Sequence, residues 1–294
     1  GNLIIHFKRY KIFADSFARQ QALTSSFSGL KTTNVGITLI QESRHDSNRF
    51  FVYGRAGFGE IAFDSEIYTD RNAGLHNATV NAIAEHPQTV SSNVILLAKD
   101  NGLYRSTDSG LNWVKVESNI FDSRAVNDVH FLEVNPTNVW VATNLNIYKS
   151  TDTGQNFSNF NNNGPDDFND PQNTEAKSIF FVSDTSRLYA AMQSGLFHSN
   201  SNGTSWSSKL TDEPNIFEIS QPSGQAETLF ILTDNNFLRS TSLSSDLTSS
   251  LTTITSDTLN TGDVNAIAFG TTAGVIFAAS ASGIFQSTDN GSSW

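Results

Sequence analysis

The sequence of 294 residues contains no cysteine and only one methionine, Met192. Without cysteine the chain cannot form a disulfide, a thiolate metal site, an iron–sulfur cluster or a cysteine nucleophile. Basic residues are also few, because 18 lysines and arginines stand against 29 aspartates and glutamates and leave a formal net charge of -11. A protein that binds duplex nucleic acid needs a basic surface to displace counterions from the phosphates, so the acidic balance argues against nucleic acid as a partner.

Long apolar runs are missing too. The longest, 94–98, has about five residues, whereas a membrane-spanning helix needs about 18 or more. Hydrophobic residues nevertheless make up 37% of the chain, which is enough to build a sizeable core. Because the only methionine lies far from the first residue, we expect the sequence to be part of a longer chain, and the lack of a visible signal peptide carries little weight.

A motif recurs along the chain at intervals of about 45 residues, the spacing of a repeat fold. Its copies read GLYRSTDSGLNW from Gly102, NIYKSTDTGQNF from Asn146, GLFHSNSNGTSW from Gly195, NFLRSTSLSSDL from Asn236 and GIFQSTDNGSSW from Gly283. Two short runs rich in β-branched and aromatic residues precede each copy, such as VNAIAEH and NVILLAK before the first. Each unit therefore predicts four antiparallel strands, which form the blade of an all-β propeller.

The pattern S-x-D-x-G-x-x-W within the motif resembles the Asp box, or BNR repeat, of the sialidase-like β-propellers, which also occurs in sortilin-type receptors and several glycoside hydrolases. We expect the aspartate to accept hydrogen bonds from backbone amides, the glycine to adopt a positive φ and the tryptophan to pack against the sheet. The resemblance implies that the boxes are structural and lie away from any active site. The box residues are Ser106, Asp108, Gly110 and Trp113; Ser150, Asp152, Gly154 and Phe157; Ser199, Gly203 and Trp206; and Ser287, Asp289, Gly291 and Trp294.

The remaining copies depart from the pattern. Ser201 replaces the aspartate in the third copy, and the fourth copy keeps only Ser240.

The repeat predicts six blades, with a seven-bladed ring as the rival arrangement. The blades lie near residues 34–75, 80–117, 126–160, 176–210, 216–251 and 264–294. The last blade stops at Trp294, before its outer strand. Residues 1–33 form an N-terminal segment, and its strand-like run 3–13 is expected to supply that outer strand and close the ring.

Two kinds of connection share one end of such blades, which we call the upper end. They are the loops from the fourth strand to the next blade and the hairpins between the second and third strands, whereas the boxes occupy the opposite, box end. Loops held on a rigid scaffold commonly carry binding residues. The candidate binding residues on the upper loops and inner strands are Arg71, His76, Glu85, Arg124, Asp128, Asp166, Asp167, Asp170 and Glu218.

One upper loop, 161–175, is longer than the others and contains Asp166, Asp167 and Asp170. Clustered hard oxygen ligands suit Ca²⁺, although the spacing matches no EF-hand. The histidines show no paired spacing of the kind that binds zinc. Calcium is therefore the one candidate metal, and no other cofactor is expected.

Enzymatic activity is not favoured by the sequence. A sialidase of the family needs three arginines, a tyrosine–glutamate pair and an acid/base aspartate, and the Arg-Ile-Pro tripeptide that carries one of those arginines is missing here. The two-propeller xyloglucanases of the family need a chain more than twice as long. A glycosidase otherwise needs two carboxylates across a cleft, for which Glu85, Asp128 and Glu218 on the inner strands are the candidates.

The sequence therefore favours a non-catalytic propeller that binds a protein or a carbohydrate through its upper end. We expect it to be secreted or exposed at the cell surface, in the extracellular or periplasmic space. A glycan-active hydrolase or lyase that uses inner-strand carboxylates is the first alternative. An assembly factor for a membrane complex is the second, and the oligomeric state stays open.

Overall fold

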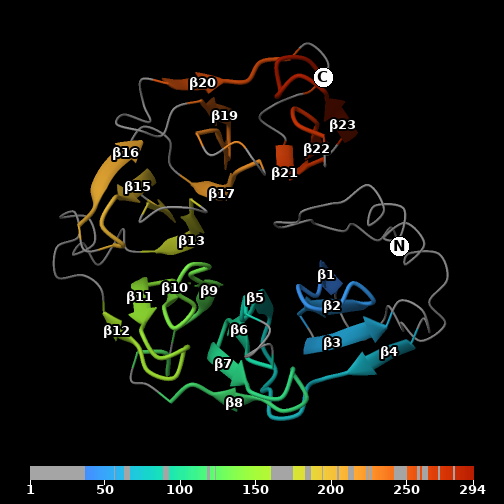
Figure 1. Cartoon of the computed structure of the whole chain (residues 1–294), viewed down its shortest axis with the longest axis vertical. Helices are drawn as coiled ribbons and strands as arrows, with labels where there is room; N and C mark the ends of the chain where they lie inside the picture. The colour runs from blue at the N-terminus through green and yellow to red at the C-terminus, as the bar shows by residue number, and fades with distance from the viewer. Residues whose placement is uncertain are drawn as a thin grey trace. The chain divides into compact units, whose positions relative to one another are not determined.

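Every regular element that the structure describes is a β-strand, and the strands form antiparallel sheets (Figure 1). The chain divides into two compact units, which meet in sequence between Asn162 and Asn163 and are described separately. The computed structural model describes residues 37–55, 57–62, 67–88, 93–117, 120–122, 124–159, 175–182, 187–193, 195–203, 205–210, 215–222, 225, 227–241, 250–256, 259, 264–270, 272–280 and 282–294.

The first unit contains three four-stranded sheets, each with its strands in chain order. They are formed by β1 (Ile37–Glu42), β2 (Arg49–Gly54), β3 (Gly57–Ala62) and β4 (Ile67–Asp70); by β5 (Val80–Glu85), β6 (Ile95–Lys99), β7 (Gly102–Ser106) and β8 (Val114–Lys115); and by β9 (Val126–Phe131), β10 (Val139–Thr143), β11 (Asn146–Ser150) and β12 (Ser158–Asn159).

The second unit contains two four-stranded sheets and one sheet of three strands in its described residues. They are formed by β13 (Ala176–Phe181), β14 (Leu188–Met192), β15 (Gly195–Ser199) and β16 (Ser207–Leu210); by β17 (Ile216–Ser220), β18 (Leu229–Thr233), β19 (Phe237–Ser240) and β20 (Leu251–Thr253); and by β21 (Val264–Phe269), β22 (Ile276–Ser280) and β23 (Gly283–Ser287).

The second strand of each middle sheet is buried on both faces. In β6, Ile95 and Leu97 belong to a core shared with the first sheet, whereas Leu96 and Ala98 belong to a core shared with the third. Successive side chains of a strand point to opposite faces, so a strand between two cores must be apolar throughout. The first four residues of β6 (ILLA) and of β18 (LFIL) satisfy this requirement and are almost inaccessible to solvent, whereas Lys99 and Thr233 end these strands at the hairpin.

The first strand of every sheet contains a register shift next to its first residue. Such a bulge re-aims one side chain away from the regular alternation. In β5 this residue is Asn81, whose side-chain amide donates to the carbonyl oxygen of Val126 in β9, 2.9 Å away. The bulge in β5 thus links the upper ends of the second and third sheets.

The structure confirms the predicted all-β, antiparallel fold. The number of blades and the closure of the ring stay predictions, and the run 3–13 lies outside the described residues. In the described part of the chain, the third strand β23 has no outer neighbour, and its Ile284 is 60% exposed. The corresponding strand β15, which does have one, is buried throughout. No helix of the described residues has the length and apolarity to cross a membrane.

Candidate functional site

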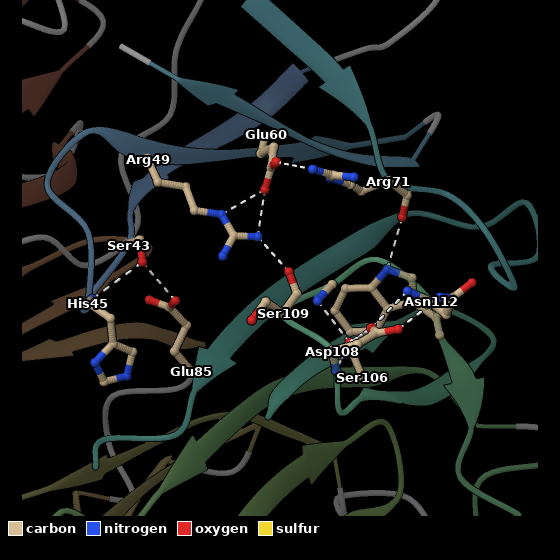
Figure 2. A network of polar contacts seen from close by, with 12 residues as sticks. Ser43, His45, Arg49, Glu60, Arg71, Glu85, Ser106, Asp108, Ser109 and Asn112 are labelled. Carbon is tan, nitrogen blue, oxygen red and sulfur yellow. Dashed lines mark hydrogen bonds and ion pairs between the residues drawn. The ribbon is translucent and has the colours of Figure 1, made fainter. Parts of the chain in front are cut away.

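The box turn after β7 is closed by hydrogen bonds between residues close in sequence. The Ser106 hydroxyl donates to a carboxylate oxygen of Asp108 at 2.8 Å and accepts the backbone N–H of Gly110, also at 2.8 Å. The carboxylate of Asp108 in turn accepts the backbone and side-chain N–H groups of Asn112, at 2.9 and 2.8 Å (Figure 2). All polar groups of Asp108 therefore serve the turn.

Two consecutive residues of each preserved turn have a positive φ. In the first box these are Ser109 at 61° and Gly110 at 84°. Only glycine adopts this conformation without steric cost, which explains why the four preserved copies of the motif keep a glycine at this position. The turn also forms in the copy that lacks aspartate, because the Ser201 hydroxyl accepts the backbone N–H of Ser205 at 2.9 Å. The serine hydroxyl therefore replaces the carboxylate as the acceptor for one backbone N–H of the turn.

Hydrogen bonding keeps the box aspartates ionised. Burial disfavours the charged form of Asp152, but hydrogen bonds from Asn156, Ser150 and Gln155 outweigh it and lower the pKa of Asp152 to about 2. Hydrogen bonds from Ser293, Ser287 and Ser292 likewise lower the pKa of Asp289 to about 2. A carboxyl group with so low a pKa is a poor general acid, so the geometry agrees with a structural role.

Replacing Asp152 with asparagine is expected to flatten the pH dependence of stability in acid. The pKa of Asp152 lies below its ordinary value when the protein is folded, so its contribution is complete above about pH 4 and is lost as the pH falls through about 2. Urea midpoints measured across this range test the expectation, with the exposed residue Asp234 changed to asparagine as the control. If the urea midpoint falls equally steeply with decreasing pH in the wild type and in the Asp152→Asn variant, the expectation is wrong.

The first box also joins its sheet to the preceding one. The indole N–H of Trp113 donates to the carbonyl oxygen of Arg71 at 2.9 Å, and its ring meets that of Phe58 edge-on with centroids 5.3 Å apart. Arg49 and Arg71 both form ion pairs with Glu60 in β3 (Figure 2). Arg71 is thus held within the packing of two sheets.

An arginine of one sheet repeatedly donates to the box of the next. Arg49 donates to the carbonyl oxygen of Ser109, and Arg105 to that of Thr153 at 3.1 Å. In the second unit Arg239 donates to the carbonyl oxygen of Asn290 at 2.6 Å. Each acceptor is the positive-φ residue before the box glycine. We call Arg49, Arg105 and Arg239 the box arginines; the sequence places Arg105 and Arg239 beside the boxes, directly before a motif serine, but does not predict their contacts with the next sheet.

His76 and Arg124 lie at the upper end of the first unit. The carbonyl oxygen of His76 accepts a hydrogen bond from Lys99, and its ring is 6.3 Å from that of Tyr104. The guanidinium of Arg124 lies over the ring of Tyr148, 5.4 Å from its centroid. These residues come from the loops before β5 and β9, where we expected the binding end of the scaffold.

Glu85 lies at the box end of its sheet. It pairs with Ile95, which in turn pairs with Ser106. Its carboxylate accepts the Ser43 hydroxyl at 2.9 Å and the backbone N–H of Arg44, so it fastens the loop after β1 (Figure 2). Glu85 is therefore a buried anchor for that loop and does not belong with the upper-end residues.

The other two inner-strand carboxylates have partners of their own. An oxygen of Asp128 in β9 lies 3.0 Å from the imidazole of His130 and also accepts the backbone N–H of Val129. Glu218 belongs to the second unit and accepts the Ser220 hydroxyl at 2.7 Å.

The calcium hypothesis is not tested by the structure. The candidate ligands Asp166, Asp167 and Asp170 lie outside the described residues. Within the described ranges, no group of three or more histidine, aspartate or glutamate side chains is arranged to hold a metal ion.

Comparison with known proteins identifies the fold. No protein-family model and no curated protein sequence matches the chain. Among solved structures, a GH74 xyloglucanase from Xanthomonas campestris is similar at 12% identity and a TM-score of 0.67 over 87% of this chain and 44% of the enzyme. YCF48 from Cyanidioschyzon merolae is similar at 18% identity and a TM-score of 0.64 over 90% of this chain and 85% of YCF48.

A third similar structure is PorZ, a surface component of the type-IX secretion system of Porphyromonas gingivalis. It shows 12% identity and a TM-score of 0.55 over 84% of this chain and 30% of PorZ. The chain thus spans less than half the length of the xyloglucanase and of PorZ, but most of the length of YCF48. These neighbours have β-propeller-type folds, which is the fold class of the present chain.

Proposed function

We propose that the chain is a non-catalytic, BNR-type β-propeller that binds a segment of another protein through its upper end. In this proposal six blades form the ring, and residues 3–13 add the outer strand beside β23. The three-stranded sheet and the exposed Ile284 in the described residues support that closure, because an added strand would cover both the open edge and this side chain. We also propose a secreted or surface location, because PorZ, which has a similar fold, is a surface component of a secretion system.

The extent of the structural likeness carries the proposal. A YCF48 structure determined with a bound D1 peptide matches 92% of this chain and 87% of its own length, with a TM-score of 0.63. Most of this chain therefore corresponds in fold to a protein that was determined with a bound peptide. The matched part of the xyloglucanase is less than half of that enzyme. Binding to a protein, as in an assembly factor for a membrane complex, needs no part of the fold beyond the one that this chain shares with YCF48.

A glycan-active enzyme is the second candidate. The likeness to the xyloglucanase and the Asp128–His130 pair on an inner strand favour it. A carboxylate beside an imidazole can exchange a proton, which is the minimum that general acid–base catalysis requires. Peptide binding and glycan hydrolysis therefore both have to be measured to distinguish the two candidates.

A peptide-library selection against the purified chain tests the proposal. We expect enriched peptides whose affinity falls by about tenfold or more when Arg124, at the upper end, is changed to alanine. Arg44→Ala, at the box end, is the matched control and should leave the affinity unchanged. Peptides that lose affinity only with Arg44→Ala, or a selection that enriches none, would contradict binding at the upper end.

Hydrolysis of xyloglucan and of chromogenic glycosides is measured on the same protein. The proposal expects no turnover above the buffer blank. Turnover that disappears in the Asp128→Asn variant, while the melting temperature stays the same, would show that the second candidate is correct.

A further inference from the structure

Lys99 is a fully buried cation at the upper end of the second sheet. Its side chain is 0% exposed, and its ammonium group donates to the carbonyl oxygen of His76 at 3.0 Å. The same group lies 5.5 Å from the centre of the Tyr104 ring. Burying an ammonium ion costs free energy even when it is paired, so a lysine in such a place needs a reason other than packing.

The equivalent hairpin position of the other sheets needs no charge. It closes the second strand, and it is occupied by Gly54, Thr143, Met192, Thr233 and Ser280. The hydroxyl residues among them bond within their own hairpin: Thr143 donates to the carbonyl oxygen of Asn146 at 2.9 Å, and Thr233 accepts the N–H of Asn236 at 2.9 Å. Lys99 instead reaches out of its hairpin to the loop that precedes the sheet.

That loop, residues 71–79, is fixed at both ends by backbone contacts. Near its start, the carbonyl oxygen of Ala73 accepts the N–H of Trp113 at 3.0 Å. At its end, the carbonyl oxygen of Thr79 accepts the N–H of Asp100 at 3.1 Å. Leu75 packs against the core, whereas His76 and Asn77 are exposed. Lys99 ties the exposed stretch between these ends to the sheet at the carbonyl oxygen of His76, next to Tyr104.

Few charged groups surround the ammonium group. Asp100 follows it in the hairpin, His76 faces it from the loop, and Tyr104 lies beside it in β7. Lys115 of β8 reaches over Gly102 and forms an ion pair with Asp122 at 4.0 Å. Burial lowers the pKa of Lys99 to about 8, against which the charge of Asp100 acts only in part. As the pH rises, the ammonium group of Lys99 therefore loses its proton at a lower pH in the folded protein than in the unfolded chain.

We propose that Lys99 is a releasable latch that holds residues 75–79 as a strap over the upper end of the second sheet. Opening the strap uncovers Tyr104 and Lys99 and offers their hydroxyl and ammonium groups to a partner. This inference rests on the proposed function, because the upper end is where the partner is expected to bind. In this proposal the buried charge lowers the stability of the folded protein, and in return residues 75–79 can detach from the sheet.

A Lys99→Met variant should change local and global stability in opposite directions. Methionine has a similar length and no charge, so we expect the melting temperature to rise. Amide hydrogen exchange at Asp100, whose N–H bonds to the loop at Thr79, should become about tenfold faster. Exchange at Asn144, which bonds to Ala125 in the same way in the third sheet, should not change. Lys115→Met, on the same sheet, is the matched control and should alter neither quantity.

The wild-type protein gives a second test that needs no substitution. Between about pH 7 and about pH 9, exchange at Asp100 should accelerate more than exchange at Asn144, because only the first depends on a charged latch. In the Lys99→Met variant this extra acceleration should be lost.

The latch would be refuted by equal exchange at Asp100 in wild type and variant. It would also be refuted by a variant that melts at a lower temperature and exchanges faster throughout the sheet, since that is the result of ordinary loss of packing. Both measurements are made without a partner, so they judge the strap even if the peptide selection fails.

Discussion

Replacing Trp113 with alanine is expected to lower the free energy of unfolding by about 3–5 kcal/mol. The ring is only 3% exposed and fills the space between two sheets, where it contacts Phe58. Removing it leaves a cavity that the rigid sheets cannot close, and it also removes the hydrogen bond to the carbonyl oxygen of Arg71. Equilibrium unfolding in urea at neutral pH measures the loss, taken from the transition that reports the first unit.

Two further variants separate the parts of this effect. Trp113→Phe keeps an aromatic ring, as in the second box, where Phe157 meets Phe121 edge-on at 5.1 Å, and should cost about 1 kcal/mol for the lost hydrogen bond. Trp206→Ala removes a partly exposed ring in the box that lacks aspartate and should cost less than Trp113→Ala. If Trp206→Ala costs as much as Trp113→Ala, burial between sheets is not the cause.

Replacing Ser106 with alanine should cost about 2 kcal/mol, the next largest loss that we expect. The hydroxyl accepts the buried N–H of Gly110 at 2.8 Å and that of Asp108 at 3.2 Å. Alanine leaves the Gly110 N–H without this acceptor in a place that water reaches poorly, and a buried donor that loses its acceptor is more costly than the bond itself is worth. The same urea measurement applies.

Ser240→Ala is the matched control for Ser106→Ala. Ser240 occupies the same place in the copy that has lost its aspartate and glycine, and its hydroxyl contacts that of Ser250 at 2.6 Å. Ser250 is partly exposed, so we expect the loss to stay below about 1 kcal/mol. Equal losses for Ser106→Ala and Ser240→Ala would show that the hydroxyl does not act through the box amides.

The strands and turns of this protein could be predicted because their causes are local. The hydrogen bonds of Ser106 and Asp108 all lie within a few residues, and a strand such as β6 is marked by the apolar run of its first four residues. A repeat adds the same evidence several times over, which makes the fold class easier to predict than any one boundary.

The contacts between sheets could not be predicted from the sequence. Arg105 reaches Thr153, 48 residues further on, and the pairing depends on how closely two sheets stack rather than on any pattern in either one. The sequence predicts Glu85 among the upper-end residues because it lies on an inner strand. Its place as the last residue of β5, just before the turn to β6, indicates the box end, and counting along the strand would have shown this.

The burial of Lys99 could not be predicted from the sequence for a different reason. The sequence shows a lysine beside a turn, where lysines are usually exposed. Its burial depends on a loop that begins 28 residues earlier, since Lys99 follows Arg71 by that interval and the loop folds back over it. A comparison of the equivalent hairpin position in each repeat, where only this copy is charged, is the signal that marks it.

The box arginines have a consequence for how such chains change in length. Arg105 and Ser106 are neighbours in β7, so one stretch of sequence holds both the donor for the following sheet and the turn that receives Arg49 from the preceding one. A gene segment that encodes one repeat, duplicated in tandem, would therefore produce a new junction whose two halves already match. Duplication or loss of this repeat then requires no compensating mutation at that junction, whereas a break between Arg105 and the box would separate the donor from the turn.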